Sequence, residues 1–354
     1  AQYLARLSGH ARAQSDAYFE GGYWIILWGA LVAILSNWLV LRTGLSARFR
    51  VWAARLSKRA GVQTLLWVVP YSIVTTLIAA PWTIYADFIR ERRYGLMNQS
   101  FGAWLGDQGI GFVVGTISLM LVLPLLLLVV RKSPQRWWLW GAGTMTIVAG
   151  FFALIAPVFI SPLFNSYTEL APGPVRERIV AMASSQHVPA DHIYVFDASR
   201  QTKRISANVS GPGPTIRISL NDNLLNRTSL AETAAVMGHE LGHYVLNHVW
   251  KMIGGMLLIL LFAFAITARA VPALLRKYGA TWGVTRMDDV AAVPAYFIVL
   301  SVLFLLLTPV TNSLVRHNES EADAFGLDVA REPDGFAEAA LALSEYRKME
   351  PGPI

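Results

Sequence analysis

Long apolar runs separated by short charged loops set the pattern of this chain. Six runs contain no Asp, Glu, Lys or Arg. Each is close to the roughly 20 residues that an α-helix needs to cross the hydrocarbon core of a bilayer. They cover residues 23–41, 61–86, 110–130, 138–160, 252–268 and 293–311. The pattern therefore predicts a mainly α-helical, polytopic membrane protein with six spanning helices.

One long polar stretch interrupts this pattern between the fourth and fifth runs. Apolar positions recur at helical spacing over residues 175–186, whereas residues 192–197 and 216–220 alternate apolar and polar side chains as strands do. The segment Gly211-Pro212-Gly213-Pro214 predicts a turn before the second strand. A small α/β module is expected here.

Two other polar segments lie nearer the N-terminus. Residues 1–22 carry an imperfect apolar stripe that includes Leu4 and Leu7, which is typical of a helix lying at the membrane interface. The loop over residues 87–109 mixes charged and aromatic side chains. It either packs against the side of the polar module or pairs its charges with one another.

The module leads into the motif His239-Glu240-Leu241-Gly242-His243. Residues four apart share a helix face, so both histidines can present a ring nitrogen to one metal ion. Two imidazoles, a third protein ligand and an open position form a zinc hydrolase site, in which Glu240 takes a proton from the attacking water. The alternative is that two histidines share a helix by chance. The low number of histidines, seven in the whole chain, argues against this alternative.

The motif is expected to lie near the membrane boundary. No helix-breaking residue separates it from the fifth apolar run, which predicts one helix over residues 230–268 that begins in water and ends in the bilayer. On such a helix His248 lies about 900° of rotation beyond His239, on the opposite face. We therefore expect His248 to be a surface or packing residue.

The third metal ligand is sought in the charged segment after the sixth run. The candidate ligands in this segment are His317, Glu319, Glu321 and Asp323, and His248 is the candidate outside it. Glu319 and Asp323 share a helix face, while the other two point elsewhere. We predict Glu319 as the ligand and Asp323 as the carboxylate that orients a metal-bound histidine. Arg316 either pairs with these acidic residues or clamps a substrate carboxylate. A solvated charged helix is the alternative.

Extended peptide substrates commonly lie against an edge strand beside such a metal. The segment 207–211 is the best candidate for that strand. Asn208 is then either a substrate-contacting strand residue or a turn residue, and the sequence leaves both open.

Composition and charge support the membrane interpretation. The chain is 54% hydrophobic and 15% charged, with a mean hydropathy of +0.43. Its net charge of +7 does not indicate nucleic-acid binding, because the basic residues concentrate in the loops 42–59, 131–136 and 269–289. These loops share one side if the spans alternate, which the positive-inside rule makes cytoplasmic. The absence of cysteine excludes disulfides and thiolate metal sites.

Taken together, these residues resemble the integral-membrane zinc endopeptidases of the CAAX prenyl protease type. The resemblance rests on the histidine motif before a membrane span and on the Arg316, Glu319 and Asp323 spacing after the next one. It extends to Tyr94-Gly95 and to residues 156–164, 197–208 and 217–225.

The resemblance implies a ring of transmembrane helices around a water-filled chamber that contains one zinc ion per chain. It implies that His239, His243 and Glu319 bind zinc, that Glu240 is the catalytic base, and that Asn208 contacts substrate backbone. Substrates would be CAAX-like, membrane-associated or misfolded proteins, and the protein would be a monomeric bacterial inner-membrane member.

This chain departs from the family pattern in three places. It shows six spans where the family has seven, and the first is the one without a counterpart. The family's Asn-Ala-Tyr edge segment is replaced by Asn208-Val209-Ser210. The printed sequence ends before the family's C-terminal histidine-proline segment.

We expect four parts: residues 1–160 with an interfacial helix and four spans, 161–250 as the α/β catalytic module, 251–315 with two spans, and 316–354 with the third ligand. The basic loops predict an extracytoplasmic active site, whereas eukaryotic members of the family imply a cytoplasmic one. Two other functions are considered: a site-2-type intramembrane protease, and a non-catalytic membrane chaperone or transporter. Spans nearly free of charge weaken the transporter hypothesis.

Overall fold

The computed structural model describes residues 3, 9–211 and 216–348. Within these ranges, six helical runs are long and apolar enough to cross a membrane: Gly9–Arg42, Ala60–Arg93, Phe101–Lys132, Trp137–Leu163, His248–Trp282 and Val290–Ala330. Each contains one of the six predicted apolar runs. The prediction of a mainly helical, polytopic membrane protein is therefore confirmed.

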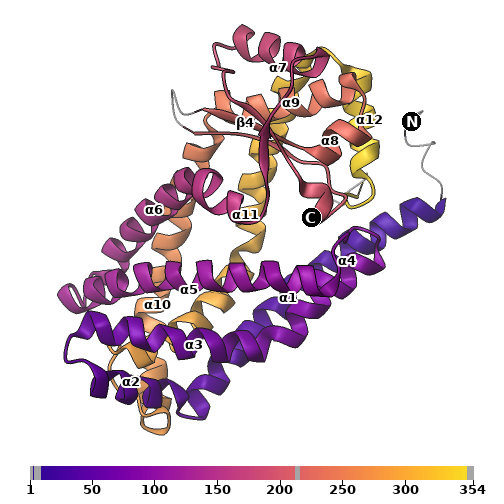
Figure 1. The fold of residues 1–354 in the computed structure, drawn as a ribbon. Helices are drawn as coiled ribbons and strands as arrows, with labels where there is room; N and C mark the ends of the chain where they lie inside the picture. Colours follow the sequence, from indigo (N-terminus) through magenta and orange to yellow (C-terminus); the bar gives the residue numbers. More distant parts are fainter. Residues whose placement is uncertain (1–2, 4–8, 212–215, 349–354) are drawn as a thin grey trace.

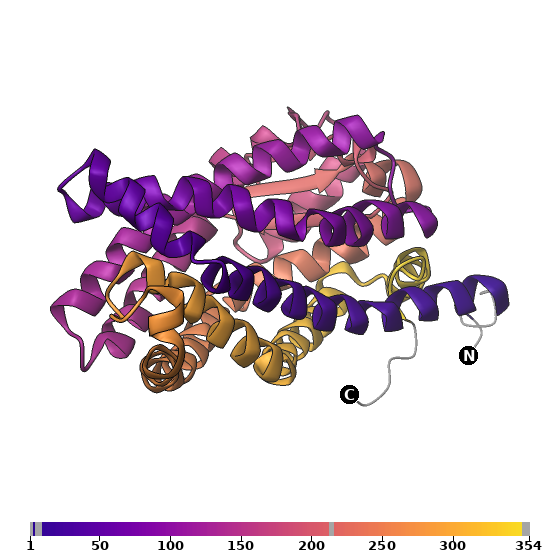
Figure 2. The ribbon, with the colours of Figure 1, turned by 90° about the horizontal axis from the view of Figure 1, so that it is seen from below.

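The spanning helices form a closed ring. The helices of this part are α1 (Gly9–Arg42), α2 (Leu45–Leu56), α3 (Ala60–Thr83), α4 (Arg90–Arg93), α5 (Phe101–Lys132), α6 (Trp137–Ile155), α10 (His248–Trp282) and α11 (Val293–Ala330). Each helix of the ring packs against the next in the order α1, α3, α5, α6, α10 and α11. Helix α11 also packs against α1, which closes the ring (Figure 2). A water-filled chamber inside the ring stays a prediction.

The helix expected over residues 1–22 is present over its described part but is not a separate element, and its place at the membrane interface stays a prediction. Residues 9–22 continue without a break into the first span as part of α1. Tyr18 is buried there, with its ring centroid 4.0 Å from the guanidinium carbon of Arg90. This packing holds the segment against the rest of the protein. Leu4 and Leu7, two of the residues of the predicted apolar stripe, lie outside the described residues.

The predicted loop 87–109 is much shorter than expected. The π-helical segment Ile84–Ile89 joins α3 to α4, and α5 already begins at Phe101 with Ser100 as its N-cap. The remaining connection packs against the polar module, as one of the two alternatives predicted: Leu96 is buried, Met97 bridges Thr202, and the Asn98 backbone N–H donates to Gln201.

The polar stretch folds as the small α/β module that its periodicity predicts. The chain leaves the membrane part through the π-helical turn Ala156–Ile160 and the 3₁₀ turn Ser161–Leu163, each of which contains a proline. The module's elements are β1 (Tyr167–Glu169), α7 (Pro174–Ser185), β2 (Ile193–Phe196), β3 (Ala207–Ser210), β4 (Arg217–Asn221), α8 (Asp222–Arg227) and α9 (Leu230–Val245). The predicted turn at residues 211–214 lies, apart from Gly211, outside the described residues.

The sheet of the module has the strand order β1-β2-β4-β3, with β2 and β4 parallel and both outer strands antiparallel to their neighbours. Its buried face packs against α9: Ile193, Ile218 and Leu220 meet Met237 and Leu241, and all five side chains are fully buried. The start of α9 is fixed by a capping box between Ser229 and Glu232. These contacts hold the histidine motif beside the free edge of the sheet at β3.

The expected continuous helix over residues 230–268 is wrong. Helix α9 ends at Val245, Asn247 adopts the left-handed conformation with φ 58°, and α10 begins at His248. Asn tolerates this conformation better than most residues because its short polar side chain bonds locally. The motif helix and the membrane helix are therefore two rods joined at Asn247.

Three glycines bring α11 against α9. An ideal Cβ atom on Gly238 would lie 2.9 Å from the Gly326 carbonyl oxygen. An ideal Cβ atom on Gly242 would lie 3.1 Å from a Phe325 ring carbon. A Cβ on Gly326 would lie only 2.7 Å from the His239 backbone nitrogen. Helix α11 extends past the membrane part along this contact, and α12 (Pro333–Leu343) then packs on α9 as well (Figure 1).

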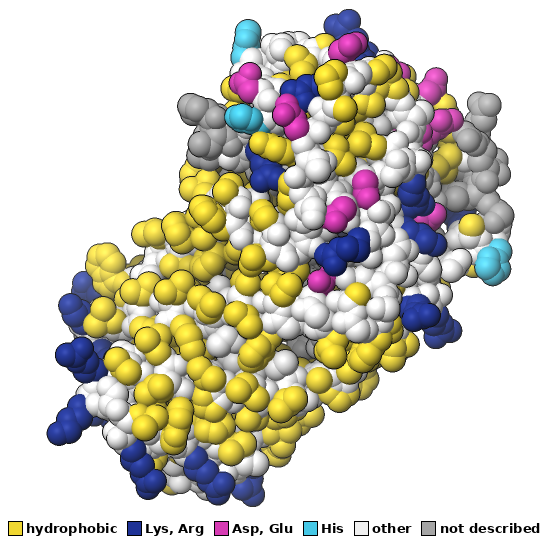
Figure 3. All heavy atoms as spheres, in the orientation of Figure 1, with side chains coloured by type: hydrophobic (Ala, Val, Ile, Leu, Met, Phe, Trp, Pro, Cys, Tyr) yellow, Lys and Arg dark blue, Asp and Glu magenta, His cyan; other side chains and the backbone are white. Residues whose placement is uncertain are grey.

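The basic loops gather at the end of the molecule farthest from the sheet. Figure 3 shows Lys and Arg side chains along that end, beyond a broad belt of exposed hydrophobic side chains. Three loops are linked there, because Arg131 donates to the Asp288 carbonyl oxygen at 3.2 Å and Arg50 pairs with Asp289. The loop after the fifth span is shorter than predicted, since Arg269, Arg276 and Lys277 belong to α10.

The glycine contact yields a stability prediction. Gly326→Ala should lower the free energy of unfolding by about 1–3 kcal/mol, because its methyl group has no space beside the His239 backbone. Thermal unfolding in detergent would measure the change as a lower Tm. Gly143→Ala on α6 is the control, since a Cβ there meets nothing within 4 Å. Equal Tm values for the two variants would contradict the close packing.

Candidate metal centre

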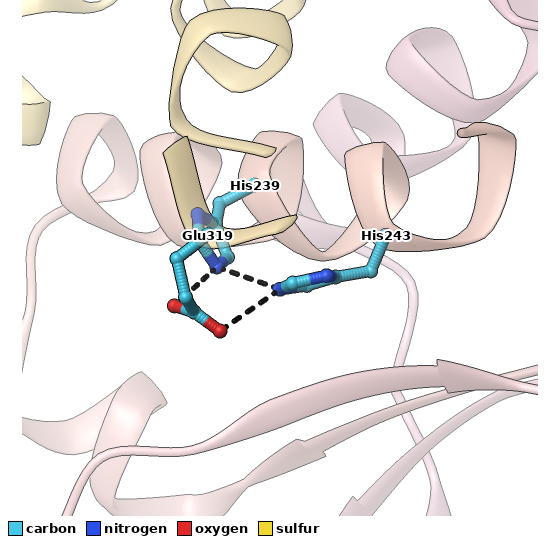
Figure 4. A group of neighbouring side chains, drawn as sticks. All are labelled: His239, His243 and Glu319. Atoms are coloured by element: carbon cyan, nitrogen blue, oxygen red, sulfur yellow. Dashed lines mark hydrogen bonds and ion pairs between the residues drawn. The ribbon is translucent and has the colours of Figure 1, made fainter. Parts of the chain in front are cut away.

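Two histidines and one glutamate converge where α9 meets α11. The Nε2 atoms of His239 and His243 lie 3.0 Å apart. Glu319 reaches them from α11, with one carboxylate oxygen 3.6 Å from His239 Nε2 and the other 3.6 Å from His243 Nε2 (Figure 4). All three ligand atoms lie within 4.8 Å of one another. The structure thus brings together the three residues predicted as metal ligands.

This donor set fits one zinc-sized ion. Bonds of about 2.0–2.1 Å at the tetrahedral angle place two ligand nitrogens roughly 3.3 Å apart. The measured separations of 3.0 Å and 3.6 Å lie on either side of that value. Two imidazoles and a carboxylate are also the ligands of many catalytic zinc sites, which keep a fourth position open. The arrangement can therefore hold a metal and leave room for a reactant.

Asp323 holds the far side of His239. Its Oδ1 lies 2.7 Å from His239 Nδ1, one helical turn after Glu319. Burial lowers the pKa of His239, but the Asp323 hydrogen bond and the charges of Glu240, Asp323 and Glu319 outweigh it and raise the pKa overall. The surplus of negative charge around this ring favours a cation. The contact is the one predicted from spacing, and its orienting role stays a prediction.

Glu240 lies beside the centre and is enclosed. It shares with His239, Asp323 and Arg347 the lining of a cavity of about 380 Å³ between α9, α11 and α12. Burial raises the pKa of the Glu240 carboxyl to about 7; the charge of Glu319 acts in the same direction, while His239 and Arg347 oppose it. A carboxyl with a pKa in this range can both accept and return a proton near neutral pH.

The sequence predicted that His248 lies on the opposite face from the motif, and this prediction is wrong. It is 3% exposed, and its Nδ1 lies 2.8 Å from the Nδ1 of His243. The break at Asn247 causes the error, because it ends the helix on which the rotation was counted and returns the next residue toward the motif. The turn-forming preference of Asn is the signal in the sequence that pointed to this break.

Asn208 is a strand residue, so the turn alternative is wrong. It lies in β3 opposite Ser219 of β4, with an exposed side chain. Strand β3 ends the sheet on that side and packs against α9. Residues of β3 line the cavities on both sides of the motif: Ala207 with His239, and Val209 and Ser210 with His243. Substrate contact by Asn208 stays a prediction.

Arg316 does not join the acidic cluster. Its side chain is exposed on α11, and among the described residues it makes no ion pair or hydrogen bond with Glu319 or Asp323. The pairing alternative is therefore wrong, and a clamp on a substrate carboxylate stays a prediction. Arg347 beside Glu240 was missed, because only the return of the chain after α12 brings it there.

Comparison with known proteins agrees with this geometry. A family model described as peptidase family M48 matches residues 170–352, and one described as the CAAX prenyl protease N-terminal region with five membrane helices matches residues 6–166. An uncharacterized metalloprotease of Bacillus subtilis, YhfN, is 28% identical over 317 residues, which cover 88% of this chain and 74% of that protein. CAAX prenyl protease 1 of Saccharomyces cerevisiae is 31% identical over 197 residues, which cover 54% of this chain and 42% of the yeast protein.

A solved structure shares the fold. The crystal structure of S. mikatae Ste24p superposes with a TM-score of 0.79, covers 98% of this chain and 85% of its own, and is 22% identical in sequence. At this identity the similarity shows the fold alone.

The ligand geometry predicts metal contents. Glu319→Ala should lose bound zinc, and Asp323→Asn should bind it about 10–100-fold more weakly, because outer partners orient metal-binding imidazoles. Metal analysis and chelator competition on the purified protein measure both. Asp328→Asn makes the same chemical change on an exposed part of α11 and should match the parent. Full zinc content in Glu319→Ala would contradict the assignment and favour a site-2-type centre.

Proposed function

The chain belongs to peptidase family M48, a family of metalloproteases, and from this premise we propose that it is a membrane-embedded zinc endopeptidase. His239, His243 and Glu319 hold one zinc ion per chain. The observation that carries the proposal is the convergence of these three side chains from two helices on one point beside Glu240. It fits the donor set, the open position and the enclosed base that metal-assisted peptide hydrolysis needs.

The residues around the metal divide the work of hydrolysis. When bound, the zinc ion supplies Lewis acidity and lowers the pKa of a coordinated water to about 7. Glu240 accepts a proton from the water while the water oxygen bonds to the scissile carbonyl carbon. The same carboxyl then gives the proton to the amine nitrogen as the C–N bond breaks. Asp323 keeps the Nε2 of His239 directed at the metal through their 2.7 Å contact.

The free edge of β3 aligns the substrate. Its backbone N–H and C=O groups pair with β4 on one side only, so an extended peptide can add to the sheet on the other side. Asn208, exposed on this strand, contacts the peptide backbone. Backbone pairing gives little selectivity by itself, because every peptide offers the same groups.

The cavity on the membrane side of the metal favours apolar substrates. It measures about 450 Å³ and extends from His243 and Glu319 between α6, α10 and α11. Its walls are almost entirely apolar and include Ala149, Met252 and Ile253. Substrates are therefore membrane-associated, lipidated or misfolded proteins that present apolar groups near the cleaved bond. The name of the yeast relative, CAAX prenyl protease 1, adds CAAX proteins to these classes.

The catalytic module faces away from the cytoplasm of a bacterial inner membrane. The support is the charge asymmetry: the end of the ring that carries exposed Lys and Arg side chains beyond the hydrophobic belt lies opposite the sheet. Translocation across the inner membrane retains basic loops on the cytoplasmic side.

Removal of the base should abolish hydrolysis without removal of the metal. Glu240→Gln should lower kcat by at least 10²–10⁴-fold, because proton transfer is lost while the amide keeps the size of the side chain. Cleavage of an unfolded protein or an apolar peptide, with zinc analysis in parallel, measures this. Glu169→Gln, at an exposed position of β1, is the matched control. Terminal proteomics of membranes that contain the active protein or Glu240→Gln would identify the natural substrates.

The proposed orientation is open to direct labelling. Because the chain has no cysteine, single cysteines at the exposed positions Arg136 and Asn226 report on the two ends separately. A membrane-impermeant maleimide applied to intact spheroplasts should label Asn226→Cys and leave Arg136→Cys unmodified until the membrane is lysed. Labelling of Arg136→Cys alone would show that the metal centre opens to the cytoplasm.

A further inference from the structure

The two motif histidines are supported differently on their outer sides. Both direct Nε2 toward the shared centre, which leaves each Nδ1 facing outward. His239 meets a carboxylate directly, at Asp323. His243 instead meets a second imidazole, because its Nδ1 lies 2.8 Å from the Nδ1 of His248.

The contacts continue beyond His248 to a charged pair. Its Nε2 lies 3.1 Å from Oε2 of Glu321, and the ammonium group of Lys251 lies 2.6 Å from the same oxygen. Lys251 is three residues beyond His248, at the start of α10, and Glu321 lies on α11 between Glu319 and Asp323. Four side chains from three helices thus form one continuous line of contacts, which runs through His243, His248, Glu321 and Lys251.

One arrangement of protons satisfies every contact in this line. A metal ligand uses the Nε2 lone pair of His243, so its Nδ1 carries the hydrogen and donates to His248. His248 then accepts at Nδ1 and carries its own hydrogen on Nε2, where it donates to the Glu321 carboxylate. A buried imidazole needs partners for both ring nitrogens, and His248 has them only if His243 presents Nε2 to the centre.

We propose that His248 and Glu321, steadied by Lys251, are positioning residues that fix the tautomer and ring orientation of His243. This rests on the proposed function, since it takes His243 to be a zinc ligand. The line does for His243 what Asp323 does for His239. Helix α11 then supplies one ligand and both outer carboxylates, so a single helix aligns all three ligands.

Paired substitutions separate positioning from packing. His248→Asn retains an amide oxygen near the position of Nδ1, where it can accept from His243. His248→Gln places its amide nearer the Nε2 position, toward Glu321, and leaves His243 Nδ1 without an acceptor. Zinc affinity by chelator competition, and the visible spectrum of the cobalt-substituted protein, would be measured for both variants and the parent.

We expect His248→Gln to bind zinc about 10–100-fold more weakly than the parent and to shift the cobalt spectrum, with His248→Asn restoring most of the affinity. Glu321→Ala should weaken binding by about 10-fold. His317→Asn is the control, because His317 is 71% exposed and contacts Glu321 from outside the line, at 3.6 Å. This control should match the parent in affinity and spectrum.

Parent-like affinity and spectrum in both His248→Gln and Glu321→Ala would overturn the proposal. So would equal losses in His248→Asn and His248→Gln, which would indicate packing alone. If the His248 variants fail to fold, as judged by Tm and gel filtration, Glu321→Ala decides, since that side chain is 35% exposed. Failure of the parent itself to bind zinc would refute the proposed function, which is a distinguishable result.

Discussion

The close contact between α9 and α11 is the constraint on which the metal centre depends. Gly238, Gly242 and Gly326 carry no side chains that would separate the two helices. Glutamate is a short ligand, so Glu319 reaches both histidines only if the helix axes approach this closely. The sheet fixes α9 from behind through Met237 and Leu241. The geometry of the candidate metal centre is therefore determined by backbone packing, and the three side chains need little adjustment to meet.

The same contact joins the α/β module to the ring of helices. Helix α11 belongs to both: its first half closes the ring against α1 and α10, and its second half lies along α9. The apolar cavity between α6, α10 and α11 opens at the junction of these halves, where His243 and Glu319 line its end. The apolar cavity thus reaches the candidate metal ligands from the side of the ring, while Glu240 lines a second cavity on the other side whose walls are more polar.

Local periodicity in the sequence predicted much of this and failed where backbone or tertiary contacts decide. Uncharged runs identified all six spanning helices, and alternation identified β2 and β4. The spacing of His239, His243, Glu319 and Asp323 was enough to group them, because each pair lies on a regular helix. His248 was misplaced because one left-handed residue resets the rotation of the helix. The predicted edge strand at residues 207–211 is confirmed by β3, whereas the ring order and the position of Arg347 depend on long-range packing, which no local pattern records.

The break at Asn247 has a geometric consequence. A continuous rod through α9 and α10 would carry His248 to the helix face opposite His239. Because the chain turns at Asn247, α10 starts in a new direction and His248 lies 2.8 Å from His243. One left-handed residue thus lets a helix of the ring and a helix of the α/β module contribute to the same group of side chains.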